Sequence, residues 1–164
     1  MQNEQQIHPA TITTRLYTGP RGELRHLFEL ADDSAAAIDE YLDKGVVLVA
    51  ESQGVIVGHL QLTPLSDPLG VEIKNMATAE SHQGMGIGRA LVLAAMDTAQ
   101  TEGAGRIVVA TAAADIGNLR FYQRQGFRIL AVDRDAFTAA TGYPGPIVID
   151  GIELRDRVWL DRPV

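Results

Sequence analysis

Three glycines alternate in the segment Gln83-Gly84-Met85-Gly86-Ile87-Gly88-Arg89, which lies between a β-rich run and a long helical pattern. Glycines at such a corner let the backbone turn sharply and leave several N–H groups uncovered by side chains. At the start of a helix, these unpaired donors and the helix dipole both favour an anion. The segment therefore predicts a phosphate or pyrophosphate site, although a tight corner without a ligand would use the same residues.

Two common phosphate-binding loops do not fit this segment. A Walker loop ends in Gly-Lys-Ser/Thr, whereas Arg89-Ala90 follow Gly88. A dinucleotide fingerprint requires a third glycine or alanine, and counting from Gly84 or Gly86 places Arg89 or Leu91 there. Both classes of nucleotide site are excluded by these residues.

Polar side chains also occur on a predicted strand and on a predicted helix. Glu72 lies within a predicted strand, where a carboxylate is unusual, and Lys74 follows two residues later on the same face. Glu72 either forms an ion pair with Lys74 or serves as a general base, a role implied by the family resemblance described below, and both interpretations stay open. Asn118 and Tyr122 are four residues apart, which places both on one face of a helix.

The elements that must position these groups follow from periodicity and turn residues. Helices are predicted near residues 24–30, 35–42, 89–102 and 115–125, and a loop over 136–151. Strands are predicted over residues 11–17, 46–50, 55–62, 71–79, 106–110, 127–132 and 152–161. The order predicts an α/β fold with a mixed sheet and helices packed against it.

The composition limits the class of protein. The 164 residues predict one domain over 11–164, preceded by a loose segment over 1–10. The net charge of −7 argues against nucleic acid as the main partner and weakly favours a cationic substrate. The chain has no cysteine, no apolar run long enough for a membrane span and no signal-peptide pattern, so a cytoplasmic location is expected. No histidine spacing suggests a metal site.

Three segments together resemble the GCN5-related N-acetyltransferase (GNAT) family. Gln83, Gly86 and Gly88 match its Gln/Arg-x-x-Gly-x-Gly/Ala signature. The preceding strand, residues 72–78, is similar to the fourth strand of that family, and residues 118–127 are similar to its second motif, which ends in Gly-Phe. The resemblance spans about residues 46–132 and implies a mixed, mostly antiparallel central sheet flanked by helices, the GNAT-like acyl-CoA N-acyltransferase fold.

The resemblance also implies a cosubstrate, acetyl-CoA, and roles for individual residues. The cofactor-binding residues would be Met76, Ala77, Thr78, Gln83, Gly84, Met85, Gly86, Ile87, Gly88, Arg89 and Asn118. The turn would hold the pyrophosphate, and the pantetheine arm would pair with the open edge of the strand at Met76–Thr78. Tyr122 would protonate the departing thiolate, for which a phenol has suitable acidity, although a tyrosine packed against the core explains the same residue.

The implied reaction is direct transfer of an acetyl or other short acyl group to an amine in a ternary complex, and the lack of cysteine agrees with it. A catalytically silent CoA-binding regulatory domain is the alternative. The acceptor, a small-molecule or peptide amine, is not identified by any motif. Homodimers occur in this family, but the sequence shows no interface. His59, His82 and Asp156 are weaker candidates, with a surface position or an ordinary hydrogen bond expected for His59 and a bulge equally compatible with Asp156.

Overall fold

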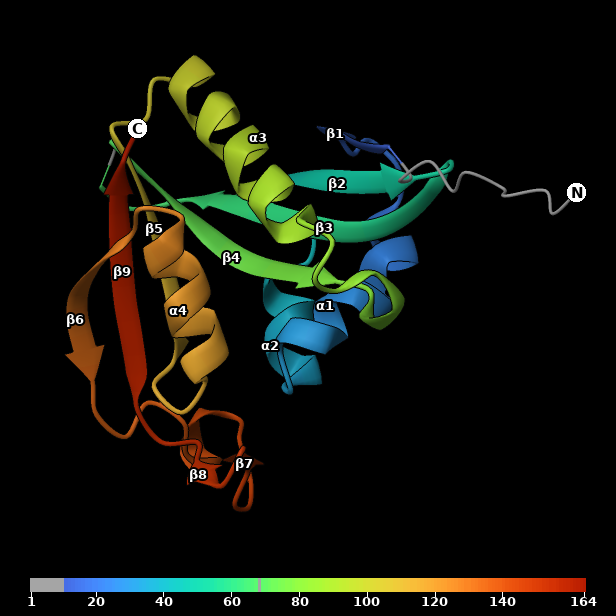
Figure 1. Ribbon diagram of the computed structural model, residues 1–164. Coiled ribbons are helices and arrows are strands. Elements are labelled where there is room, and N and C mark those ends of the chain that lie inside the picture. The colour runs from blue at the N-terminus through green and yellow to red at the C-terminus, as the bar shows by residue number, and fades with distance from the viewer. Residues whose placement is uncertain (1–10, 68) are drawn as a thin grey trace, which may run out of the picture.

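The computed structural model describes residues 11–67 and 69–164, so the expected loose segment 1–10 lies outside the described residues. Seven strands form one sheet in the order β1-β2-β3-β4-β5-β9-β6 (Figure 1). All neighbouring pairs are antiparallel except β4 and β5, which run parallel. The predicted mixed, mostly antiparallel sheet is therefore confirmed. Its strands are β1 (Ile12–Leu16), β2 (Val46–Ser52), β3 (Val55–Pro64), β4 (Gly70–Thr78), β5 (Arg106–Ala112), β9 (Arg157–Pro163) and β6 (Arg128–Asp133).

Helices cover both faces of the sheet. On one face lie α1 (Arg25–Ala31) and α2 (Ala35–Tyr41), and on the other lie α3 (Ile87–Thr101) and α4 (Ile116–Arg124) (Figure 1). Each face has its own hydrophobic core, one beneath α1 and α2 and a larger one beneath α3 and α4. None of the helices described within residues 11–164 is long and apolar enough to cross a membrane.

Local chemistry explains where these elements begin and end. The Ser34 hydroxyl accepts the N–H of Ala37 and starts α2, while the Asp115 carboxylate accepts the N–H of Asn118 and starts α4. The chain leaves α3 through Gly103, whose φ is +80°, a value that glycine adopts without steric cost. Polar caps and a glycine therefore set these helix boundaries.

The β4 and β5 strands are neighbours over only part of their length. Gly70–Ile73 pair with Arg106–Val109, but no later residue of β4 pairs with β5. On its other edge β4 continues to pair with β3 as far as Thr78, with a bulge at Lys74. The strands separate beyond Ile73, and β4 keeps one edge without a strand partner.

Two predictions from apolar patterns are wrong. The expected strand over 152–161 is split, because Ile152–Glu153 (β8) pair with Val148–Ile149 (β7) in a separate hairpin. The chain then breaks at Asp156, whose carbonyl accepts the N–H of Ala113, before β9 begins. The expected loop 136–151 thus contains β7 and a short 3₁₀ turn, Ala139–Thr141. Leu30 lies within the helix predicted near residues 24–30, but it is 49% exposed.

Candidate functional site

The glycine-rich turn forms a row of free backbone donors at the start of α3. Gly84 and Gly86 have φ values of +76° and +81°, and Gly86 is the N-cap residue of α3. Among the described residues, no hydrogen-bond acceptor is found for the N–H groups from Gly84 to Arg89. A Cβ at either glycine would have no neighbouring atom within 4 Å, so the cradle is open. Such a cradle fits a phosphate or pyrophosphate group.

The third glycine of the turn has a packing role. A Cβ on Gly88 would lie 3.1 Å from the Phe121 ring of α4, closer than most Cβ contacts in proteins. Gly88 therefore allows the start of α3 to approach α4. The approach brings the turn next to the helix that carries Asn118 and Tyr122. The Asn118 side chain is exposed and can reach a ligand, while its backbone N–H is occupied by the Asp115 cap.

Met76, Ala77 and Thr78 lie on the part of β4 that has separated from β5. Their backbone pairs with β3 on one edge only, and all three residues are half-buried. The unpaired edge presents N–H and C=O groups to the opening between the strands, as the edge of any sheet does. An extended, amide-bearing chain could pair there like an additional strand, which is the shape of a pantetheine arm.

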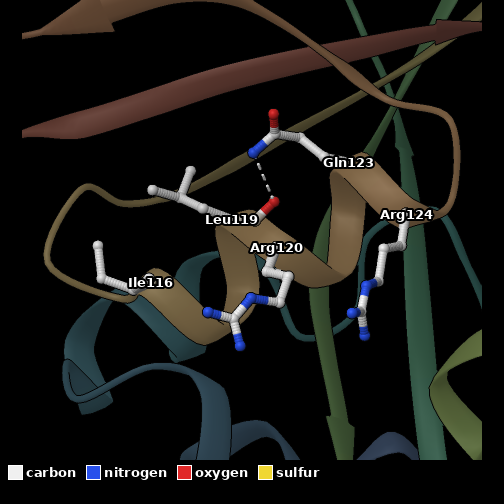
Figure 2. Close-up of a pocket in the computed structure, with 5 residues that line it drawn as sticks. All are labelled: Ile116, Leu119, Arg120, Gln123 and Arg124. Atoms are coloured by element: carbon white, nitrogen blue, oxygen red, sulfur yellow. Dashed lines mark hydrogen bonds between the residues drawn. The ribbon is translucent and has the colours of Figure 1, made fainter.

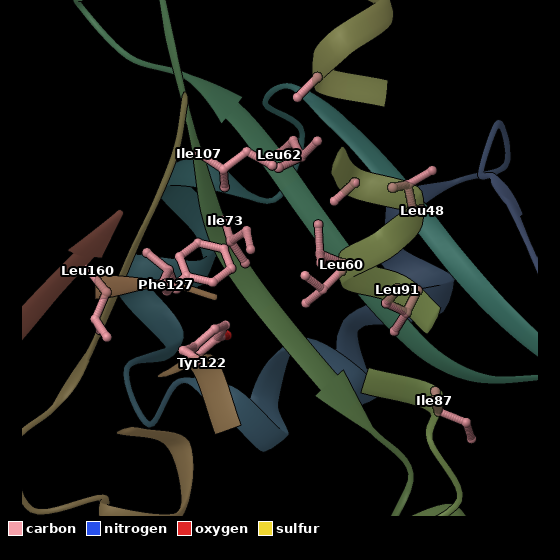
Figure 3. Packing of buried hydrophobic residues seen from close by; sticks show 14 of the residues in the cluster. Leu48, Leu60, Leu62, Ile73, Ile87, Leu91, Ile107, Tyr122, Phe127 and Leu160 are labelled. Atoms are coloured by element: carbon pink, nitrogen blue, oxygen red, sulfur yellow. The ribbon is translucent and has the colours of Figure 1, made fainter. Parts of the chain in front are cut away.

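Tyr122 reaches the core from α4. Its ring packs edge-on against Phe121 at 5.1 Å and Phe127 at 5.5 Å, and it is 5% exposed. Burial raises the pKa of Tyr122 well above its usual value, so the phenol holds its proton at neutral pH. The hydroxyl has no hydrogen-bond partner within the described chain and points toward β4 (Figure 3). The ring therefore packs as a core residue, and the hydroxyl remains free to donate a proton.

Glu72 lies on the paired part of β4 with its side chain 14% exposed. The Lys74 Nζ atom is 3.9 Å from Glu72 Oε1, beyond hydrogen-bond range. Burial raises the pKa of Glu72, and the charges of Lys74 and Arg157 oppose this shift without cancelling it. A loose ion pair with Lys74 is therefore present, and the role of Glu72 as a general base stays a prediction. Glu72 and Lys74 line a cavity of about 410 Å³ beside Tyr41 of α2.

Hydrogen bonds among Asp32, Tyr41 and Tyr143 hold the segment after β6 against α2. None of these residues belongs to a motif of the sequence. Asp32 accepts hydrogen bonds from Tyr41 at 2.8 Å and from Tyr143 at 3.2 Å. Tyr143 also packs against Phe137 within its own segment. The available signal was an aromatic residue in a glycine- and proline-rich stretch, which is typical of a loop docked through a side chain. Asp32 carried no signal, because its partners are distant in sequence.

The weaker candidates lie apart from the opening. His59 is completely buried and stacks on Phe28 at 4.2 Å, so the expected surface or hydrogen-bonded position is wrong. Neither ring nitrogen has a hydrogen-bond partner among the described residues. The His82 ring interacts with the Ser81 hydroxyl beside the turn, and Asp156 accepts the N–H of Asp135 in a loop rather than in a bulge.

A larger hollow of about 540 Å³ lies on the surface of α4 and contains none of the expected site residues (Figure 2). Its lining comes from a single helix, with the Arg120 and Arg124 side chains directed away from Leu119 and Gln123. The free donors of the turn and Tyr122 do not line this hollow, and Glu72 lines the cavity beside Tyr41. Within residues 11–67 and 69–164, no cluster of three or more histidine or acidic side chains could hold a metal ion.

The chain is similar to known acetyltransferases over nearly its whole length. Residues 13–127 match the Acetyltransferase (GNAT) family. The sequence is 40% identical to the uncharacterized N-acetyltransferase YvbK of Bacillus subtilis, over 85% of this chain and 89% of that protein. Its fold matches a Bacillus subtilis acetyltransferase in complex with CoA, with a TM-score of 0.86, 36% identity, and coverage of 94% of this chain and 99% of that one. A GNAT acetyltransferase from Elizabethkingia anophelis with acetyl-CoA bound gives a TM-score of 0.85 and 33% identity, covering 93% of this chain and 98% of that one.

Proposed function

The chain belongs to the GNAT acetyltransferase family and is an acetyl-CoA-dependent N-acyltransferase, and we propose that it transfers the acetyl group directly to an amine in a ternary complex. One observation carries this proposal. The free donors of the turn at Gly84–Arg89 lead into an opening that has the Tyr122 phenol on one side and the Glu72 carboxylate on the strand that borders it.

The turn and the open edge of β4 bind the cosubstrate in this proposal. The N–H groups from Gly84 to Arg89 hold the pyrophosphate, with Gln83 at the entrance of the turn. The backbone of Met76–Thr78 pairs with the pantetheine arm, and the exposed Asn118 amide contacts it from α4. Acetyl-CoA supplies the activated thioester, and an N–H of β4 that faces the opening polarises its carbonyl.

Two side chains move the protons. Glu72 accepts one proton from the neutral amine nitrogen as the N–C bond forms, directly or through one water. An acceptor that arrives as an ammonium ion first loses a proton to solvent. The C–S bond breaks, and the sulfur takes the proton of the Tyr122 hydroxyl. CoA then leaves the enzyme as the free thiol. Burial keeps the Tyr122 phenol protonated at neutral pH, so a proton is available as the C–S bond breaks. The tyrosinate that is left is a stronger base than the thiolate and recovers a proton from solvent. The reaction then consumes one proton at Tyr122 and releases one to Glu72, so solvent returns both groups to their starting states.

The proposed acceptor is a small-molecule or peptide amine that enters from the side of α1, α2 and the segment over 134–151. Asp32, Tyr41 and Tyr143 close one wall of that side through their shared hydrogen bonds. A chain with a net charge of −7 attracts cationic amines from a distance. Acetyl-CoA is the expected donor. CoA thioesters of other short acyl groups would compete for the same opening.

A direct assay tests the proposal. The protein is incubated with acetyl-CoA and a panel of aliphatic amines, polyamines, amino acids and peptide N-termini, and release of free thiol is followed. We expect turnover with at least one amine and a rise in melting temperature on addition of acetyl-CoA. Failure to bind acetyl-CoA would contradict the proposed turn site. Binding without turnover on a broad panel would indicate the catalytically silent CoA-binding domain instead.

A further inference from the structure

Strand β6 forms one edge of the seven-stranded sheet and is exposed along its whole length. Ile129, Leu130 and Val132 are 57%, 50% and 55% exposed, a run of apolar residues on a strand with a free edge. Natural edge strands normally carry lysine or proline that prevents pairing, and neither residue occurs in Arg128–Asp133. The helices do not cover this strand, since it lies outside β9 at the border of the sheet (Figure 1).

The sequence of β6, Arg-Ile-Leu-Ala-Val-Asp, is complementary to itself when read in the opposite direction. In an antiparallel pair centred between Leu130 and Ala131, Arg128 of one copy lies opposite Asp133 of the other, and Ile129 lies opposite Val132. Both ends of the pair then have opposite charges, and the centre is apolar. Opposite-charge and β-branched cross-strand pairs each stabilise such a ladder modestly.

Side chains that face each other across a two-fold axis must lie on the same face of the sheet. In a regular strand, Arg128 and Asp133 would lie on opposite faces, because they are separated by an odd number of residues. The pairing of β6 with β9 contains a bulge between Ile129 and Ala131, which adds one residue, Leu130. The bulge is therefore what makes a two-fold pairing of this strand geometrically consistent.

The partners of β6 in β9 confirm which face each side chain takes. Ile129 and Val132 lie opposite Leu160 and Val158, which are buried in the core beneath α3 and α4. Asp133 lies opposite Arg157 and accepts the Trp159 indole N–H at 2.8 Å, so it is on the other face.

Arg128 lies opposite Asp161, which alternates with buried Leu160 and so shares the face of Asp133. All hydrogen bonds that Asp133 accepts from the described residues use Oδ2, which leaves Oδ1 available for an additional donor. The two side chains that would meet across the axis are thus on the same face, and the acceptor atom is available.

We propose that β6 is a homodimer interface at which two copies pair antiparallel about a two-fold axis between Leu130 and Ala131. The dimer joins both sheets into one continuous sheet, and each Arg128 forms an ion pair with Asp133 of the other copy. Because the interface is isologous, the assembly closes at two copies rather than growing into a fibre. A single strand pair buries less than the roughly 1,200 Å² of standard interfaces, so the dimer is expected to be weak and concentration-dependent.

Sedimentation velocity from low micromolar to several hundred micromolar protein tests this interface. The wild-type chain should shift from monomer to dimer with increasing concentration. Arg128→Asp and Asp133→Arg each place like charges opposite one another at both ends of the pair. Each variant alone should dimerise at least about tenfold more weakly, since two cross-strand pairs change sign. Lys44→Asp, which changes the net charge as Arg128→Asp does but lies beside α2, should dimerise as the wild type does.

Mixing the two variants provides the decisive arm. In a mixed dimer, the aspartate introduced at position 128 of one chain would face the arginine introduced at position 133 of the other. At the opposite end of the pair, the native Asp133 of the first chain would face the native Arg128 of the second. The mixture should therefore recover dimer that neither variant forms alone. Circular dichroism confirms that each variant is folded, which matters for Asp133→Arg because it loses the contact with Trp159.

Amide hydrogen exchange gives a second measurement, which detects pairing of β6 directly. Outward-facing amides of β6 should exchange more slowly as the concentration of wild-type or Lys44→Asp protein rises, but not for Arg128→Asp. A wild-type chain that stays monomeric overturns the proposal. So does a dimer that resists Arg128→Asp, or a mixture of the two variants that remains monomeric.

Discussion

The Tyr122 hydroxyl is separable from the Tyr122 ring, because the ring makes the packing contacts and the hydroxyl makes no hydrogen bond with the described residues. Tyr122→Phe should therefore keep the fold and lower kcat. Loss of a positioned general acid typically costs about 10²-fold or more. The measurement is steady-state thiol release at saturating acetyl-CoA, together with a thermal melt.

Tyr17→Phe is the matched control, because the Tyr17 hydroxyl bonds to Pro20 and Glu23 beside β1, far from the opening. It should leave kcat unchanged. If Tyr122→Phe turned over at the wild-type rate, Tyr122 would be a packing residue and the thiolate would take its proton from elsewhere.

The ionised carboxylate of Glu72 is expected to favour activity and to lower the stability of the fold. Burial raises the pKa of its carboxyl group, so the unfolded chain loses this proton at lower pH than the folded one. The ionised carboxylate therefore destabilises the fold, and this cost grows as pH rises from about 4.5 through the raised pKa of the folded protein. Glu72→Gln should lower kcat/KM and abolish its rise with pH, while raising the melting temperature at pH 7 and not at pH 4.

Lys74→Met tests the ion-pair interpretation of the same residue. Without the Lys74 charge, the pKa of Glu72 should rise further, so the pH dependence of kcat/KM should move to higher pH while activity persists. Loss of all activity in Lys74→Met, with Glu72→Gln still active, would assign the carboxylate a structural role only.

At the scale of elements, substitutions at the two ends of α3 can separate cosubstrate binding from helix stability. Gly86 and Gly103 flank α3 with nearly equal φ values of +81° and +80°, and a Cβ at either position would meet no atom within 4 Å. Alanine at each should cost a similar amount of stability, about 1–2 kcal/mol, because both must adopt the left-handed region. Only Gly86→Ala disturbs the donors of the turn.

The expected result is a rise of about tenfold in KM for acetyl-CoA in Gly86→Ala, which corresponds to roughly 1.4 kcal/mol of binding. Gly103→Ala should have the wild-type KM and the same loss in melting temperature. Equal KM values in the two variants would show that the turn does not hold the cosubstrate.

The elements that were predicted correctly have causes that lie within a few residues. Alternate glycines specify the turn, and Asp115 and Gly126 bound the helix that carries Tyr122. The missed features depend on distant partners. The predicted strand over 152–161 looked continuous because its apolar residues alternate, yet the carbonyl of Asp156 bonds to Ala113 at the end of β5. No local pattern records such a bond.

At the scale of the whole molecule, the separation of β4 from β5 could be expected only through the family resemblance. The apolar strand residues of β4 and β5 are compatible with full pairing, yet their pairing ends at Ile73, next to the bulge at Lys74 in the pairing of β4 with β3. The contact of Asp32 with Tyr143 likewise requires the finished fold. The turn and the helix that carries Tyr122 were therefore predictable from local residues, whereas the contact between Asp32 and Tyr143 was not.

His59 is buried between α1 and the sheet, and its burial should make the stability of the whole fold fall in acid. Burial between β3 and Phe28 lowers the pKa of His59 to about 4, with the nearby Asn75 amide partly opposing that shift. The unfolded chain binds a proton at His59 near pH 6.5 and the folded chain does not, so stability falls as pH drops from about 6.5 to 4. The loss is on the order of 3 kcal/mol, since each pKa unit corresponds to about 1.4 kcal/mol.

Urea unfolding at a series of pH values measures this loss of stability. His59→Leu should flatten this part of the curve, and His82→Ala, which removes an accessible histidine, should not. An unchanged slope in His59→Leu would place the acid sensitivity in other groups.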